Sequence, residues 1–536
     1  MNTAVDTRDG LPLTVGTLLR ARAEARGDHP LLVCDDAVLT YAQAADRSGT
    51  LARGLYALGT GPGTHVGLLY PNGPDFVVGW LATARLGAVT VPISTFSTGP
   101  ELRTLLRNAD VAVLLAARRA RDRDLGAAVS DAVPALGPGR GLGVDDGPLL
   151  DPALPVLRRV VFDPDAVIDA GDAVPAATVE AIERTVTPGD RMVIVHTSGS
   201  TSEPKGVIHQ HGPLIRHLDG LNRLRRYTAQ EVLFSNSPFF WIGGFAYSLL
   251  GTLLAGATLV CSNASVAAAT LDLLERTRPT IVNGFAASVA HLARDPSFPR
   301  RDLRSIRRGN LWPIMPDDVR PADPELRHNM LGMTETGSVC LASDDEGDQP
   351  ERRRGSFGRP VPGFEARVVD PENGRDCAPG VTGELWLRGP FLMEGYYGRE
   401  RHETFTADGW FRTGDLVHVD DEGFHYFHGR LGDMIKTAGA NVSPREVEAA
   451  IAEVSGIVAH VVGVEDPERG QIVAAVLRVP DGGSPPDTGA LRAALARRLS
   501  SYKVPRRFVV VADRDVPMLS SGKVDAQALR ELARRG

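Results

Sequence analysis

The residues with the clearest chemical purpose follow a run of apolar residues. Residues 193–206, VIVHTSGSTSEPKG, pass from an expected strand into small hydroxylated residues and glycine and then reach Lys205. Small residues allow backbone N–H groups to approach an anion, hydroxyls add donors, and the lysine adds a point charge. The Gly-Lys-Ser/Thr ending of a Walker loop is absent. The segment predicts a phosphate-binding loop of another kind, with an ordinary polar loop as the alternative.

Lysine is scarce in this chain. Among 59 basic residues only four are lysines, namely Lys205, Lys436, Lys503 and Lys523. The composition is typical of a GC-rich genome, in which arginine replaces lysine wherever a positive charge suffices. Lysine is a compact charge on a flexible stem, whereas arginine is a rigid planar fork. The remaining lysines therefore indicate where to look for chemistry.

Four further segments combine glycine with carboxylates, threonine or lysine. They are residues 329–337 (NMLGMTETG), 408–415 (DGWFRTGD), 429–448 (GRLGDMIKTAGANVSPREVE) and 521–523 (SGK). With the loop, this ordered series resembles the adenylate-forming superfamily of acyl-CoA synthetases, peptide-synthetase adenylation domains and firefly-type luciferases. The resemblance covers the chain from about residue 13 to residue 529. It is that of a free-standing, acyl-CoA synthetase-like member of actinobacterial type.

The resemblance implies a reaction in two steps. An acid oxygen attacks the α-phosphate of Mg-ATP, giving an adenylate and pyrophosphate, and a nucleophile, commonly the thiol of CoA, then displaces AMP. Lys523 would neutralise charge on the α-phosphate, and Thr334 would donate to it. Glu335 would bind Mg²⁺, which prefers carboxylate oxygen. Lys436 and Gly439 fall in the region that the superfamily uses for CoA or the second step.

The nucleoside half of ATP has its own candidates. Asp415 would accept both ribose hydroxyls, for which an ionised carboxylate is the natural acceptor, and Arg430 would contact the ribose–phosphate side. Leu331 stands where the superfamily usually has an aromatic residue that stacks on adenine, and Asn310 is expected to read an adenine edge. The other ATP-binding candidates are Thr197, Ser198, Gly199, Ser200, Thr201 and Lys205.

The acid pocket is expected around residues 238–244 (PFFWIGG). Trp241 stands where acyl-CoA synthetases often carry histidine, and its bulk favours a small, flat or aromatic acid over a long fatty acid. A core aromatic is the alternative interpretation of this residue. Phe245, Asn283 and Met333 are its expected neighbours.

The alternation of helix-like and strand-like stretches predicts an α/β fold. Residues 1–429 are expected to form a large N-terminal domain of mixed, mostly parallel sheets with helices and a β-rich subdomain. Residues 430–536 are expected to form a small mobile α+β domain that rotates about a hinge near 430–433. Gly432 stands there where Asp or Lys is typical, and glycine widens the accessible φ/ψ range. The arginine-rich start of residues 117–160 predicts a surface helix followed by a loop.

Composition bounds the function. The chain has 536 residues, 43% of them hydrophobic, and a net charge of −7, which argues against a nucleic-acid or anionic-membrane binder. Its four scattered cysteines show neither metal spacing nor a disulfide framework, which fits a reducing cytoplasm. No signal peptide is seen. Residues 248–261 are too short to span a bilayer and predict a buried helix-to-strand segment. His209-Gln-His211 predicts a helix start rather than a metal site.

Three functions remain open at this point. The first is an ATP-dependent acid–CoA ligase. The second is adenylation of a non-carboxylate acid such as nitrite, with transfer to an arylamine or another non-CoA acceptor in natural-product biosynthesis. The third is a non-catalytic nucleotide-binding homologue, against which the five polar candidates Thr334, Glu335, Asp415, Arg430 and Lys523 argue. The identity of the acid and the oligomeric state are not readable from the sequence.

Replacing Lys523 by alanine is expected to abolish acid-dependent adenylation and to spare the release of AMP from a preformed adenylate. The reason is that a lysine on a rotating domain reaches the α-phosphate in one orientation only. Loss of one preorganised donor lowers a rate by ~10²–10³, and loss of a full charge lowers it further. Rapid-quench assays of both half-reactions check this, and equal losses in the two would contradict the rotating-domain assignment.

Overall fold

The computed structural model describes residues 5–6, 10–136, 147–197, 204–431, 435–437, 440–442, 444–467, 469–480, 483, 485–499, 503–519 and 524–535. The described chain divides into two compact units. Unit 1 comprises residues 1–354, 360–364 and 389–406, and unit 2 comprises residues 355–359, 365–388 and 407–536. In these described ranges no helix is long and apolar enough to cross a membrane.

The larger sheet of unit 1 has seven strands among the described residues. The first five neighbours run parallel, and β12 then turns back antiparallel between β11 and β22. Val, Ile and Leu run almost unbroken through the central strands, as is usual for strands buried on both faces. In spatial order the strands are β10 (Arg159–Val161), β7 (Val113–Ala116), β5 (His65–Leu69), β6 (Val89–Pro92), β11 (Arg191–Thr197), β12 (Lys205–Gln210) and β22 (Gly395–Tyr396).

A second sheet of the same unit has six described strands. All of its pairings are parallel except the last, between β3 and β4. In spatial order they are β16 (Arg308–Gly309), β15 (Ile281–Asn283), β13 (Val232–Ser235), β14 (Thr258–Cys261), β3 (Pro30–Cys34) and β4 (Ala37–Thr40). A hairpin of β17 (Leu331–Met333) and β18 (Ser338–Ala342) completes the strands used below.

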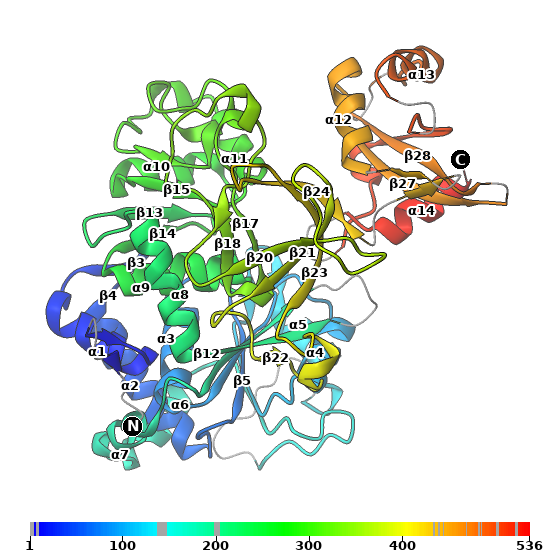
Figure 1. Ribbon diagram of the computed structural model, residues 1–536. Helices are drawn as coiled ribbons and strands as arrows, with labels where there is room; N and C mark the ends of the chain where they lie inside the picture. Colours follow the sequence, from blue (N-terminus) through cyan, green and yellow to red (C-terminus); the bar gives the residue numbers. More distant parts are fainter. Residues whose placement is uncertain are drawn as a thin grey trace. The chain divides into compact units, whose positions relative to one another are not determined.

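Helices connect and cover these strands (Figure 1). Thr14 and Thr40 begin the first two, each through a capping box in which the threonine side chain accepts from the backbone three residues on. Helix α3 is apolar nearly all round because it contacts β5 and β6 of one sheet and β4 of the other. The helices are α1 (Val15–Arg26), α2 (Tyr41–Ala57), α3 (Pro74–Arg85), α4 (Gly99–Asn108), α5 (Leu125–Ala132), α6 (Asp165–Ala170), α7 (Ala176–Thr185), α8 (His211–Leu224), a π-helix (Gly243–Leu250), α9 (Gly251–Ala255), α10 (Ala267–Thr277) and α11 (Ala286–Ala293).

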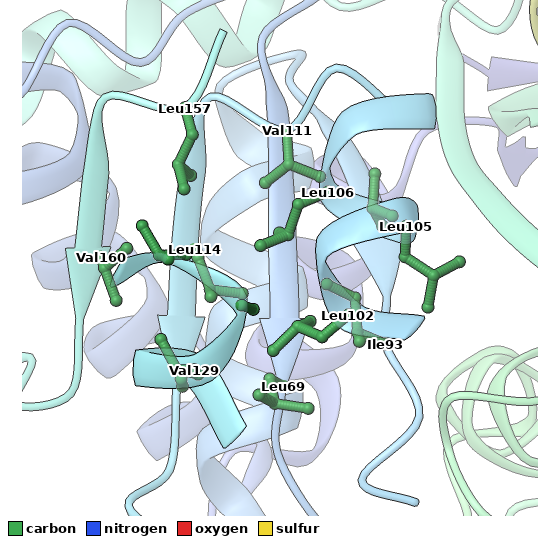
Figure 2. Packing of buried hydrophobic residues seen from close by; sticks show 14 of the residues in the cluster. Leu69, Ile93, Leu102, Leu105, Leu106, Val111, Leu114, Val129, Leu157 and Val160 are labelled. Atoms are coloured by element: carbon green, nitrogen blue, oxygen red, sulfur yellow. The ribbon is translucent and has the colours of Figure 1, made fainter. Parts of the chain in front are cut away.

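The core under helices α4 and α5 shows how the larger sheet is covered (Figure 2). Leu102 and Leu106 of α4 and Val129 of α5 pack with Leu69 and Leu114 of the strands, and all are at most 1% exposed. Complete burial of such side chains contributes about 1.5–3 kcal/mol each. This packing fixes α4, and with it the loop that joins α4 to β6.

Unit 2 contains two sheets. One is antiparallel, in the order β20 (Glu365–Val369), β21 (Gly383–Arg388), β23 (Phe411–Val419) and β24 (His425–Arg430). The other consists of β26 (Ala440–Val442), β25 (Ile435–Thr437), β28 (Gly470–Val479) and β27 (Ala459–Asp466), with β29 (Arg507–Ala512) parallel to β28. Its helices are α12 (Pro444–Ser455), α13 (Thr488–Ala496) and α14 (Ala526–Arg535).

Most sequence-based expectations for the fold are confirmed, including the α/β class, the parallel sheets and the buried helix-to-strand segment that ends in β14. The surface helix expected at the start of residues 117–160 is wrong. A short antiparallel pair, β8 (Arg119–Ala120) and β9 (Arg123–Asp124), stands there and turns at Arg121 with φ 52°. Asp124 then caps α5, because its carboxylate accepts from the N–H of Ala127. The expected domain boundary near residue 430 stays a prediction.

Candidate active site

Strands β11 and β12 form the hairpin that holds the expected phosphate loop. Thr197 and Lys205 lie directly opposite each other at its loop end, as the last pair of the register. Ser198, Gly199, Ser200 and Thr201 lie outside the described residues. The two ends of the loop are therefore fixed by ladder hydrogen bonds of the larger sheet.

A tight turn between β17 and β18 carries Thr334 and Glu335. It is a single 3₁₀ turn, Thr334–Thr336, followed by Gly337 at φ 69°. The buried hydroxyl of Thr336 donates to the carbonyl of Ser338 at 2.6 Å and accepts from the N–H of Met333 at 3.2 Å. Glycine suits the left-handed position, which other residues adopt only with strain. The two candidate catalytic side chains thus project from a rigid turn.

His209 of β12 ties that turn to the larger sheet. Its Nε2 lies 2.7 Å from the carbonyl oxygen of Thr334. Burial lowers the pKa of His209 to about 4, so the ring is neutral near pH 7. Because a carbonyl only accepts, the neutral ring carries its proton on Nε2 and donates it to Thr334.

Tyr396 of β22 connects two of the candidates. Its hydroxyl donates to Oε1 of Glu335 at 2.8 Å. The ammonium of Lys205 lies 5.0 Å from the centroid of the same ring, within cation–π range. A carboxylate suited to a metal ion and a cation suited to phosphate are therefore held by one side chain.

In unit 2, Asp415 and Arg430 are cross-strand partners on β23 and β24. Nε of Arg430 lies 2.9 Å from Oδ1 of Asp415, whose side chain is 4% exposed. Next to Asp415 in β23, the N–H of Gly414 donates to the buried carboxylate of Glu384 at 3.0 Å. The structure brings together the two residues predicted to contact ribose.

Four aromatic side chains meet in unit 1 at the ends of strands from both sheets. Trp241 has its ring centroid 5.4 Å from Phe240, 5.7 Å from Phe285 and 6.4 Å from Phe96. Phe96 and Phe285 are 39% and 53% exposed, so this aromatic cluster faces solvent in part. Phe96 follows β6, Trp241 follows β13 and Phe285 follows β15. Carboxyl ends of parallel strands are where α/β folds place ligands.

Other predicted site residues have different surroundings. Phe245 is fully buried with its ring 5.2 Å from Trp80, which places it in the core. The side chain of Asn310 makes two hydrogen bonds of 2.9 Å with the backbone of Gly284, so it fastens the segment that leads to Phe285. Asn283 and Met333 are buried and Leu331 is half-buried at the ends of β15 and β17. Their roles stay predictions.

For several predicted residues the structure describes no side-chain contact. Lys523, Gly432 and Gly439 are outside the described residues, and Lys436 is described as a backbone position of β25. In the described ranges, no group of three or more His, Cys, Asp or Glu side chains could hold a metal ion by itself. Among the described residues, His209 and His211 belong to no such group. Helix α8 begins at His211, as the sequence indicated.

Sequence reasoning missed Tyr396, His209 in its present role, Phe96 and Phe285. The signals were weak because each depends on a contact between distant segments. Tyr396 is 61 positions from Glu335, and His209 is 125 positions from Thr334. A local signal existed for Phe96, which stands two residues before the capping residue Thr98 of α4.

Comparison with known proteins gives a consistent result. The family described as AMP-binding enzyme matches residues 19–397, and the AMP-binding enzyme C-terminal domain matches residues 446–523. An indoleacetate–CoA ligase of Aromatoleum aromaticum is 31% identical over 93% of this chain and 94% of that protein. A feruloyl-CoA synthase of an Amycolatopsis species is 32% identical over 91% and 92%. The crystal structure of ATP-bound MatB from Rhodopseudomonas palustris has a TM-score of 0.78 at 26% identity, covering 97% of this chain and 98% of that chain.

Replacing Trp241 by alanine is expected to shift acid selectivity towards bulkier acids, because it removes the central ring of the aromatic cluster. The ratio of kcat/KM for bulky and small acids should rise about tenfold or more, as a pocket contact of this size allows. Phe285→Ala should move the ratio in the same direction. An unchanged ratio together with a lower melting temperature would assign Trp241 to packing alone.

Acid is expected to destabilise unit 1 through its buried histidines. Burial lowers the pKa of His196, His209 and His211 to about 4 and that of His217 to about 3, from 6.5. At a pH between the folded and unfolded pKa values, these histidines bind more protons in the unfolded chain than in the folded one. The free energy of unfolding therefore falls as pH falls from about 6.5 towards 4. Melting temperatures between about pH 7 and pH 5 check this. His217→Leu, outside the candidate site, should flatten the decline, and a variant as steep as the wild type would contradict the assignment.

Proposed function

The chain belongs to the family of AMP-binding enzymes, and from this premise we propose that it activates a small or aromatic carboxylic acid and transfers it to CoA. It is an ATP-dependent, AMP-forming ligase. The first half-reaction forms an acyl-adenylate and pyrophosphate. The second forms a thioester and releases AMP.

One observation carries the assignment of the catalytic groups. Lys205 and Glu335 come from distant parts of the chain and are held by the ring and the hydroxyl of Tyr396. A lysine beside the phosphate loop can neutralise phosphate oxygens, and a carboxylate can bind a hard divalent cation. A nucleoside triphosphate with its metal ion needs both a cation and a carboxylate. If Lys205 and Glu335 formed only a structural ion pair, they would need neither an aromatic residue between them nor a loop beside them.

Mg²⁺ fits this donor set. Mg²⁺ keeps several waters and is commonly bound by one or two carboxylates together with substrate phosphates, rather than by an all-protein cage. Glu335 supplies one carboxylate, and the hydrogen bond from Tyr396 uses only one of its oxygens. The ion, when bound with ATP, would neutralise charge on the phosphates. The protein's part is to hold the carboxylate in place.

In the proposed mechanism the acid oxygen attacks the α-phosphorus in line with the bond to pyrophosphate. That bond breaks as the new P–O bond forms, and the charge on the α-phosphate is met by Thr334 and by Lys523. Asp415 and Arg430 hold the ribose, as their cross-strand pairing supports. The thiolate of CoA then attacks the acyl carbon, and AMP leaves with the electrons of the C–O bond.

The acid is proposed to be aromatic or short. The aromatic cluster of Phe96, Phe240, Trp241 and Phe285 offers ring edges and faces to a flat substrate. The indoleacetate–CoA ligase and feruloyl-CoA synthase relatives are named for aryl acids. Both relatives are also named for CoA, which favours CoA over an arylamine as acceptor.

Two finer proposals complete this function. Residues 430–536 would rotate about 430–433 between the half-reactions, so that Lys523 serves the first and a different face serves the second. The cytoplasm would be the compartment, because ATP and CoA are available there. The described cysteines are all free thiols, which suits a reducing compartment.

A pyrophosphate-release assay tests the proposal with acetate, medium- and long-chain fatty acids, benzoates, cinnamates and nitrite, each with and without CoA. The expected products are AMP and pyrophosphate, with aromatic or short acids turned over faster than long-chain acids and with stimulation by CoA. ADP formation, or no acid-dependent pyrophosphate, would refute the ligase assignment. Stimulation by nitrite with an arylamine, and by no carboxylate with CoA, would replace it by the non-CoA alternative.

A further inference from the structure

Tyr396 occupies a fixed place beside the phosphate-loop hairpin. Strand β22 pairs antiparallel with β12, with Tyr396 opposite Val207. The N–H of Tyr397 donates to the carbonyl of Gly206 at 2.7 Å. The N–H of Glu394 donates to the carbonyl of Ile208 at 2.9 Å. The backbone that carries Tyr396 is therefore part of the same sheet that carries Lys205.

The turn bearing Glu335 is tied to the same two strands. The N–H of Met393, just before β22, donates to the carbonyl of Glu335 at 2.9 Å. His209 of β12 donates to the preceding carbonyl, that of Thr334, at 2.7 Å. The backbone of the turn is thus fixed independently of Tyr396, so that loss of the tyrosine hydroxyl would release the Glu335 side chain alone.

We propose that Tyr396 is the positioning residue that sets Glu335 for the metal ion and Lys205 for the phosphates of ATP. This inference rests on the proposed function. The hydroxyl donates a hydrogen bond to one carboxylate oxygen of Glu335 at 2.8 Å, and the second oxygen stays available for a cation. The ammonium of Lys205 lies over the face of the ring, 5.0 Å from its centroid. This cation–π contact restricts the flexible side chain of Lys205. Tyr396 is 8% exposed, and its own position is therefore set by packing.

The two tasks belong to different parts of one side chain, which makes them separable. Phenylalanine keeps the ring and lacks the hydroxyl, so Tyr396→Phe removes the hydrogen bond to Glu335 and keeps the contact with Lys205. Leucine lacks both the ring and the hydroxyl, so Tyr396→Leu removes both contacts.

The next residue supplies a matched control. The hydroxyl of Tyr397 donates to Oδ2 of Asp110 at 2.7 Å, and its ring meets the edge of His65 at 5.2 Å. Tyr397→Phe also removes a tyrosine hydroxyl that donates to a carboxylate, and the two hydrogen bonds have similar lengths, 2.7 Å and 2.8 Å. In the described chain, the hydroxyl of Tyr397 contacts neither Lys205 nor Glu335.

The experiment compares the wild type with Tyr396→Phe, Tyr396→Leu and Tyr397→Phe. Pyrophosphate release is measured against Mg²⁺ concentration, and ATP binding is measured by calorimetry in EDTA and in excess Mg²⁺. In Tyr396→Phe the half-saturating Mg²⁺ concentration should rise about tenfold, since a hydrogen bond to a charged group is lost. Its ATP affinity in EDTA should stay within about twofold of the wild type.

Tyr396→Leu should show the same rise in the half-saturating Mg²⁺ concentration and, in EDTA, about three- to tenfold weaker ATP binding. Tyr397→Phe should match the wild type in both measurements. Equal effects of Tyr396→Phe and Tyr397→Phe, or none from Tyr396→Phe, would overturn the inference. If the wild type releases no acid-dependent pyrophosphate, the proposed function fails. The calorimetric comparison in EDTA still decides whether Tyr396 holds Lys205 for ATP.

Discussion

Strand β12 is hydrogen-bonded along both edges, and the candidate site of unit 1 depends on that pairing. One edge pairs with β11 and closes the hairpin of the expected phosphate loop. The other pairs with β22 and brings Tyr396 to Lys205 and Glu335. From its own side chains β12 adds His209, which holds the turn of Thr334. A strand fixed on two sides cannot shift its register without moving every one of these groups.

Burial supports this arrangement electrostatically. His209 stays neutral near pH 7 because burial lowers its pKa to about 4, so it donates one hydrogen bond and adds no charge beside Lys205. The site therefore has its positive charge on the lysine and its negative charge on Glu335. Tyrosine, a neutral donor with an aromatic face, suits the space between them, because it satisfies both without cancelling either.

The aromatic cluster is built differently. Its side chains come from loops that follow strands of two sheets, and Asn310 and Asn236 fasten the backbone next to Phe285. Loops positioned by a rigid scaffold can change their side chains without changing the sheets. The side chains of the aromatic cluster can therefore change without disturbing the sheet that holds Lys205 and Tyr396.

The sequence by itself determined the α/β class, the parallel sheets, the buried helix-to-strand segment at residues 248–261 and the ordered motifs of the family, because those signals are local in the chain. It also singled out Asp415 and Arg430 as candidates, but not their pairing across β23 and β24. Only the tertiary structure decided that Phe245 belongs to the core, that Asn310 fastens Gly284, and that the start of residues 117–160 is a strand pair. It alone brought Tyr396 to Glu335 and His209 to Thr334. Contacts between segments so far apart depend on sheet order and register, which no local pattern encodes.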